Sequence, residues 1–199
     1  MRPATDPAAP AAAPAARSRF GDNGPLGMAL FVFTEIMLFA GFVSAFSIVR
    51  DSAPPGAWPP AGQPRLPVER TAINTAALLL SGVALWRAGA AFRAGRTGAA
   101  ARWTGGAVAL GTAFVVLQGA EWTALLRQGL TLTSSQLGSF FYVIIGAHAL
   151  HAVGAIVALA LAWRLMLLRR LSVSRFGAVS MFWWFVVLVW PVLYWRVYR

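Results

Sequence analysis

Five long apolar runs, separated by short polar segments, restrict the fold of this chain more than any other feature. The hydrocarbon core of a bilayer is about 30 Å thick, so a spanning helix needs about 20 largely apolar residues. All five runs reach this length, and none alternates with the period of two that marks a membrane β-strand. We therefore expect an all-α, polytopic membrane bundle whose five transmembrane helices cover residues 26–49, 71–92, 103–126, 137–168 and 176–198.

The composition supports a membrane protein. Of the 199 residues, 58% are hydrophobic and 12% are charged, which is less charge than a soluble domain needs to cover its surface. The absence of cysteine excludes disulfides and thiolate chemistry. The net charge of +11 comes from arginine without lysine, and the arginines fall between the apolar runs instead of forming one patch. This distribution is typical of a topology signal and argues against a nucleic-acid partner.

The N-terminal residues are rich in Ala and Pro and lack the apolar core of a signal peptide. We predict a disordered tail at residues 1–20 and one transmembrane domain at residues 21–199. With the N-terminus inside, eleven of the 17 arginines fall in inner segments and six in outer segments. Because the inner segments of membrane proteins are enriched in arginine, we predict an inner N-terminus and an outer C-terminus.

Five polar residues inside the apolar runs form the candidate site: Glu35, Gln118, Glu121, His148 and His151. Glu35 and the two histidines lie near the middle of their runs, while Gln118 and Glu121 share a face near the outer end of the third run. A buried carboxylate either takes up a proton or finds a partner. We therefore predict that Glu35 hydrogen-bonds to His148 or His151, directly or through water.

Two interpretations of these residues stay open: a buried polar cluster that fixes helix packing, and a proton relay through Glu35, His148 and Glu121. Metal and haem sites are disfavoured, because the two histidines have no third histidine or cysteine to complete a ligand set. We expect no catalytic residue, no metal site and no cofactor bound by this chain itself.

Small residues in the fourth run predict a helix-packing surface. Gly154, Ala158 and Ala162 recur every four residues, so on a helix they form one flat stripe. Such a stripe lets a neighbouring helix approach closely, and it carries no chemistry by itself.

Several motifs follow one another in a specific order. The first run reads GPLGMALFVFTEIMLFAGFVSAF with its intramembrane glutamate, and the loop after it contains WPP. The second run begins INTAALLLSG, the third ends LQGAEW, the fourth carries GAHALH, and the fifth ends in an aromatic stretch with Trp190 and Tyr194. Taken together, residues 24–198 resemble subunit III of the haem–copper oxidases.

The resemblance implies a non-catalytic subunit of a respiratory terminal oxidase of the cytochrome c type, which passes electrons to oxygen and translocates protons. It implies that the chain packs mainly against subunit I, contacts other oxidase subunits and membrane lipids, and lies in the inner (plasma) membrane of a prokaryote. Cytochrome c is then the electron donor, and haem and copper are expected in partner subunits. Bound phospholipid is expected between the helices, and Glu35 matches the carbodiimide-reactive carboxyl of the family.

The chain departs from the family in two ways. It has five apolar runs where longer members have seven helices, and it has Trp184 and Val187 where much of the family has a histidine and an aspartate. Quinol-oxidase subunits and the accessory protein of nitric oxide reductase share the five-helix plan, so the electron donor stays open. An independent membrane transporter and an assembly factor are the remaining alternatives.

Overall fold

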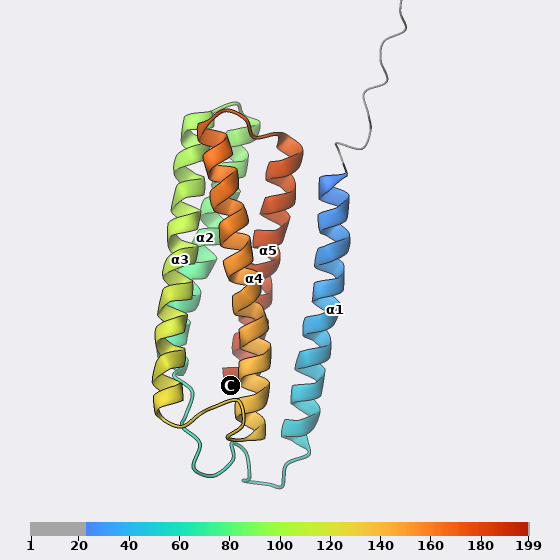
Figure 1. The fold of residues 1–199 in the computed structure, drawn as a ribbon, viewed down its shortest axis with the longest axis vertical. Coiled ribbons are helices and arrows are strands. Elements are labelled where there is room, and N and C mark those ends of the chain that lie inside the picture. The colour runs from blue at the N-terminus through green and yellow to red at the C-terminus, as the bar shows by residue number, and fades with distance from the viewer. Residues whose placement is uncertain (1–22, 199) are drawn as a thin grey trace, which may run out of the picture.

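The computed structural model describes residues 23–198, and its helices run up and down the molecule in alternating directions (Figure 1). The helices are α1 (Gly24–Asp51), α2 (Val68–Arg93), α3 (Thr97–Arg127), α4 (Gln136–Leu167) and α5 (Val173–Tyr198). Each is long and apolar enough to span a membrane, and the described residues contain no strand. The predicted all-α fold with five spanning helices is confirmed, whereas the predicted tail at residues 1–20 lies outside the described residues.

The helices begin and end close to the predicted apolar runs, except at the start of α3. This helix begins at Thr97, although the apolar run begins only at residue 103. The additional residues include alanine and arginine, which are good helix formers that a search for apolar runs overlooks. Gly95 adopts a left-handed conformation with a φ of 71° just after α2, which lets the chain reverse within residues 94–96.

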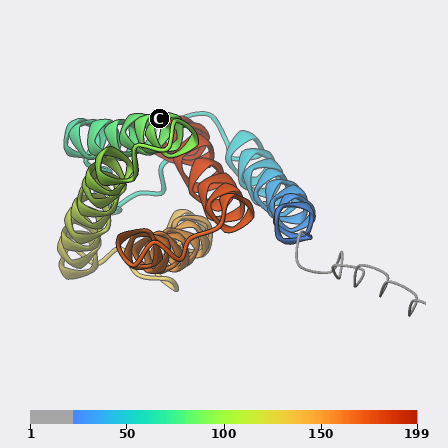
Figure 2. The ribbon, with the colours of Figure 1, turned by 90° about the horizontal axis from the view of Figure 1, so that it is seen from above.

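Four helices form a closed bundle, and α1 packs on its outside. Within the bundle α2 contacts α3, α3 contacts α4, α4 contacts α5, and α5 contacts α2. The end-on view shows α1 beside α5, and α1 also makes a smaller contact with α4 (Figure 2). Only Phe39 and Phe46 of α1 are buried, so most of this helix faces away from the other four.

The described chain begins and ends at opposite ends of the bundle, as an odd number of crossings requires (Figure 1). We call the end that holds the start of α1 the N-terminal end, and the end that holds the close of α5 the C-terminal end. The assignment of these ends to the two sides of the membrane stays a prediction from the arginine distribution.

The interior of the bundle packs the aromatic rings of α5 against glycines of α2 and α3. Trp183 and Trp190 are fully buried at its centre. A Cβ atom added at Gly111 would lie 2.7 Å from Cζ2 of Trp183, and one added at Gly82 would lie 3.1 Å from Cγ1 of Val187. Glycine at position 82 therefore allows α5 to pack closely on α2, and glycine at position 111 leaves room for the Trp183 ring, which reaches α3 across the interior.

We expect the Gly111→Ala substitution to destabilise the bundle, even though alanine favours a helix over glycine by about 1 kcal/mol. The added methyl group would push against the buried Trp183 ring, and overpacking of this kind costs about 1–3 kcal/mol. Gly106→Ala is the matched control, because nothing lies within 4 Å of a Cβ atom at Gly106 of the same helix. The thermal unfolding midpoint should be lower for Gly111→Ala than for Gly106→Ala, and an equal or higher midpoint would contradict this account of the packing.

Candidate functional site

Glu35 of α1 and His151 of α4 meet at about the middle of their helices. Nε2 of His151 lies 3.0 Å from Oε2 of Glu35, and the two side chains are 14% and 16% exposed. The structure thus brings Glu35 close to His151 and not to His148, but it shows no hydrogen bond between the two side chains, so the predicted hydrogen bond stays a prediction. Phenylalanine rings of α1 and α5 surround the imidazole: Phe31, Phe39, Phe182 and Phe185.

The second ring nitrogen of His151, Nδ1, has a backbone partner. Nδ1 lies 2.7 Å from the carbonyl oxygen of Ala147, so it carries a hydrogen and donates it. The other ring nitrogen, Nε2, is left on the side of the ring that lies beside Glu35.

The contact between Glu35 and His151 is close but does not have the geometry of a hydrogen bond. Oε2 of Glu35 is buried and makes no aligned hydrogen bond within residues 23–198, although Nε2 of His151 is only 3.0 Å away. The two groups attract each other at this distance as an ion pair or as an acid and a base. The contact links α1, the least buried helix, to the bundle at a depth where lipid offers no hydrogen-bond partner.

His148 lies one turn before His151 but in a different environment. It is 1% exposed, and neither of its ring nitrogens has a hydrogen-bond partner among the described residues. Its ring centroid lies 4.9 Å from that of Trp190 and about 6 Å from those of Phe39 and Phe114. His148 is therefore a polar side chain enclosed by aromatic rings.

A second group of polar residues joins α2, α3 and α5 towards the C-terminal end. Nε2 of Gln118 donates to the Tyr198 hydroxyl at 2.9 Å and to Oε2 of Glu121 at 3.3 Å. Asn74 donates to Oε1 of Gln118 at 3.1 Å, and the Thr71 hydroxyl donates to Oε2 of Glu121 at 2.8 Å. We call these five residues the Gln118 cluster. It ties three helices together through polar contacts that lipid tails do not offer.

Sequence reasoning placed Gln118 and Glu121 together but did not include the other three members of the Gln118 cluster. Thr71 and Asn74 are three residues apart, so they share one face of α2, and that spacing inside an apolar run was the available signal. Tyr198 ends α5 and offers no comparable pattern, because its role depends on how the last turn of α5 meets α3.

The proton relay stays a prediction. No hydrogen bond among residues 23–198 joins His148 to Glu35 or to the Gln118 cluster. The polar groups therefore form two separate systems, the pair of Glu35 with His151 and the Gln118 cluster, and His148 belongs to neither. Within the same residues, no group of three or more His, Asp or Glu side chains is arranged to hold a metal ion, and the expected lack of a metal site stays a prediction too.

The predicted packing stripe of α4 faces mostly away from the other helices of this chain. Gly154 is exposed, Ala158 is half-buried, and only Ala162 is buried. Ala155 and Leu159 carry the inward face instead. Small residues at a spacing of four define a stripe but leave open which face it occupies. A Cβ atom added at Gly154 would still lie 3.9 Å from a ring carbon of Phe182 of α5. The packing role of the whole stripe stays a prediction.

Trp184 and Val187 of α5 stand where much of the family that the sequence resembles has a histidine and an aspartate, and both pack against α2. A Cβ atom added at Gly82 of α2 would lie 3.1 Å from Val187 and 3.3 Å from Trp184. Val187 is buried and Trp184 is half-buried. A tight apolar contact between α2 and α5 therefore occupies the place where much of that family has a histidine and an aspartate.

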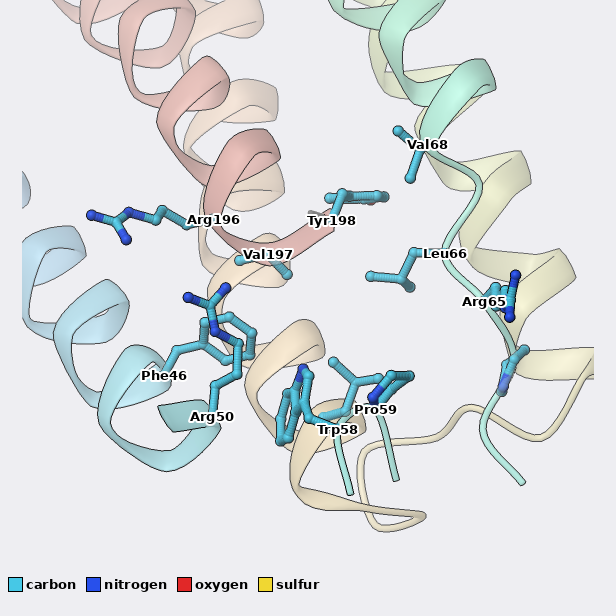
Figure 3. A pocket seen from close by; sticks show the side chains of 12 residues that line it. Phe46, Arg50, Trp58, Pro59, Arg65, Leu66, Val68, Arg196, Val197 and Tyr198 are labelled. Carbon is cyan, nitrogen blue, oxygen red and sulfur yellow. The ribbon is translucent and has the colours of Figure 1, made fainter. Parts of the chain in front are cut away.

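A cavity of about 350 Å³ opens at the C-terminal end, between the last turns of α1 and α5 and the connection from α1 to α2 (Figure 3). Arg50 reaches into it beside Trp58, while Arg65 and Arg196 lie on opposite sides of it. Arg50 pairs with Asp51 at 3.3 Å, and within residues 23–198 no ion pair is found for Arg65 or Arg196. The cavity is therefore rich in positive charge.

The contact between Glu35 and His151 can be tested by two substitutions of one residue. Glu35→Leu leaves Nε2 of His151 without a partner, and a buried polar group in that state costs about 1–3 kcal/mol. Glu35→Gln should cost less, because its amide N–H can donate to that nitrogen. We expect thermal unfolding midpoints in the order wild type, Glu35→Gln, Glu35→Leu. Equal midpoints for the two variants would show that the contact contributes nothing.

Known proteins with related sequences agree with the motifs and the fold. The family model described as cytochrome c oxidase subunit III matches residues 19–199. Cytochrome c oxidase subunit 3 of Synechocystis sp. is 34% identical over 176 residues, which cover 86% of this chain and 73% of that protein. The proteins of the same name from Damaliscus lunatus and Tragelaphus oryx are each 32% identical over 179 residues, which cover 86% of this chain and 67% of each relative. The chain belongs to the cytochrome c oxidase subunit III family.

Proposed function

We propose that this chain is the third subunit of a respiratory haem–copper oxidase of the cytochrome c type. The observation that carries this proposal is the family match over nearly the whole chain, including all five spanning helices. In this role the chain supports subunit I, where oxygen is reduced and protons are translocated. The same match favours neither a quinol oxidase, nor a nitric oxide reductase accessory protein, nor a transporter or assembly factor.

The chain itself is proposed to be non-catalytic, with haem and copper held by partner subunits. The arrangement of its two histidines supports this assignment. His151 is engaged by Glu35 and by the carbonyl of Ala147, and His148 is enclosed by aromatic rings. Neither imidazole is presented with a second histidine from another helix, which haem ligation or a shared metal would favour.

We assign the pair of Glu35 and His151 a structural role within the membrane. Ionisable groups at this depth are costly unless they pair, so the contact favours one position of α1 against α4. The Gln118 cluster fixes α2, α3 and α5 in the same way towards the C-terminal end.

The exposed surface of α1 supports the proposal that the chain works within a larger membrane assembly. Large apolar side chains cover this helix from end to end, and Leu26, Phe33 and Met37 are each more than 60% exposed. Such a surface is suited to lipid or to another membrane subunit. We propose subunit I as the main protein partner and the plasma membrane of a prokaryote as the location, with the N-terminal end inside.

The arginine-rich cavity supports the proposal of a bound phospholipid. Arg196 borders both this cavity and an apolar groove of about 470 Å³ between α1 and α5, which Phe39, Val43 and Leu193 help to line. An acyl chain suits the groove, and a phosphate group suits Arg50 and Arg196 at its end. The combination of an apolar groove with arginines at the membrane surface matches the two parts of an anionic phospholipid.

We expect the double substitution of Arg50 and Arg196 by glutamine to reduce the amount of anionic phospholipid that co-purifies. The phosphate would lose both charged partners, while the apolar groove would stay unchanged. Arg127→Gln is the control, because Arg127 lies at the same end of the bundle but outside the cavity. Mass spectrometry of extracted lipid, normalised to protein, measures the effect. Equal lipid content in the double variant and the control would exclude this site.

Purification of the tagged chain in a mild detergent tests the oxidase assignment. We expect haem absorption bands to co-purify at a fixed ratio and the preparation to consume oxygen with reduced cytochrome c. Oxygen consumption driven by quinol alone would contradict the cytochrome c assignment and favour a quinol oxidase. A colourless preparation without oxygen consumption would contradict the oxidase subunit itself.

A further inference from the structure

Exposed arginines gather at the N-terminal end of the bundle. Four belong to the end of α2, the start of α3 and the turn between them: Arg87, Arg93, Arg96 and Arg102. Four more belong to the end of α4, the start of α5 and their connection: Arg164, Arg169, Arg170 and Arg175. All eight are exposed, and both connections lie at the same end of the bundle (Figure 1). We call these eight residues the arginine surface.

The two groups of arginines are neighbours because the start of α3 packs against the end of α4. The Thr104 hydroxyl of α3 lies 3.9 Å from Sδ of Met166 of α4. A Cβ atom added at Gly105 would lie 3.0 Å from Cζ2 of Trp163. The arginines of both connections therefore belong to one region of the molecule.

The acidic residues between positions 23 and 198 do not neutralise this charge. They lie at mid-helix or towards the C-terminal end: Glu35, Asp51, Glu69 and Glu121. Within the same range, the guanidinium groups of the arginine surface make no ion pair and no hydrogen bond. Residues 1–22 contain three arginines and two aspartates, so their composition does not supply the missing negative charge either. The counter-charge therefore comes from outside this chain.

The backbone at Arg169 favours a different residue. The helices α2, α3 and α4 end alike: a left-handed residue follows, and the next N–H donates to a carbonyl of the last turn at 2.8 to 3.0 Å. The left-handed residue is Gly95 after α2 and Gly129 after α3, but Arg169, with a φ of 54°, after α4. Glycine adopts this conformation at lower energy than arginine. The turn alone therefore does not explain the arginine, whereas a role for its charge does.

Apolar side chains are exposed among the arginines of the connection from α4 to α5. Leu167, Leu168 and Val173 are each more than half exposed, and they flank Arg169 and Arg170 in the sequence. A phospholipid offers a phosphate to guanidinium groups and acyl chains to apolar side chains. An acidic protein segment would pair with the arginines but leave the apolar side chains in water. The mixture therefore favours lipid.

Tryptophans accompany the arginines of α2 and α3. Trp86 precedes Arg87 and is 59% exposed, and Trp103 follows Arg102 and is 42% exposed. Tryptophan is enriched where a membrane meets water, at the level of the lipid headgroups. The guanidinium of Arg87 lies over the Trp103 ring, 5.4 Å from its centroid. This contact holds a positive charge at the depth of the headgroups.

We propose that the arginine surface binds anionic phospholipids of the surrounding leaflet. Their phosphate groups contact the guanidinium groups, and the exposed apolar side chains enter the acyl region. An arginine near the membrane surface favours anionic over neutral lipid by about fivefold. This surface lies at the opposite end of the bundle from the arginine-rich cavity, so it is a separate site. The inference rests on charge, exposure and backbone conformation and not on the assignment of the chain to an oxidase.

Three substitutions of Arg169 test the proposal at one position. Arg169→Gln and Arg169→Gly remove the charge, and Arg169→Lys is the matched control that keeps it. The intact purified complex, with Arg50→Gln and Arg196→Gln to silence the arginine-rich cavity, is titrated with phosphatidylglycerol or phosphatidylcholine, and native mass spectrometry counts the bound lipid. We expect the preference for phosphatidylglycerol to fall about fivefold for Arg169→Gln and Arg169→Gly and to persist for Arg169→Lys.

The thermal unfolding midpoint in detergent without added lipid separates lost binding from a damaged fold. The midpoint of Arg169→Gly should equal or exceed that of wild type, because glycine suits the left-handed conformation. A lower midpoint would overturn the role given to Arg169. Equal binding of the two lipids by the complex with an intact arginine surface, or an unchanged preference in Arg169→Gln and Arg169→Gly, would overturn the proposal and leave the surface to an acidic segment of a partner.

Discussion

The requirement that polar groups within a membrane find partners inside the protein governs this structure. Lipid tails offer no hydrogen bonds, so each intramembrane carboxylate, amide and imidazole either meets another polar group or stays costly. The contact between Glu35 and His151 is the clearest case, because α1 buries only Phe39 and Phe46 and lies outside the bundle of the other four helices. The position of α1 is thereby set by its packing along α5, by one polar contact and by a shell of phenylalanine rings.

The same requirement explains the interior of the bundle. The Gln118 cluster connects α2, α3 and α5, while large rings such as Trp183 fill the space left by Gly111. Polar contacts select which faces of the helices meet, and the pairing of large with small residues lets the helices approach closely. The polar contacts and the pairs of large and small residues each involve more than one helix, so a substitution in one helix alters the packing of its neighbours. This behaviour suits the supporting role proposed for the chain.

The sequence predicts the number and approximate position of the helices, because the thickness of the bilayer sets the length of the apolar run that each spanning helix needs. It also predicts that Glu35 meets a histidine of the fourth helix, because the residues share a depth. It does not distinguish His151 from His148, since that choice depends on the rotation of α4, and for the same reason it does not show that Gly154 faces outward. Thr71, Asn74 and Tyr198 were missed because uncharged polar residues in apolar runs give a weak signal until their neighbours on other helices are known.

A double-mutant cycle on Glu35 and His151 tests the central claim most directly. The stability of the purified complex would be measured for wild type, Glu35→Leu, His151→Leu and the double variant. If the two side chains are partners, each single substitution removes the same contact, and the coupling free energy should reach at least about 1 kcal/mol. Strictly additive effects would show that the two residues contribute independently, and would contradict the account in which this contact places α1 on the bundle.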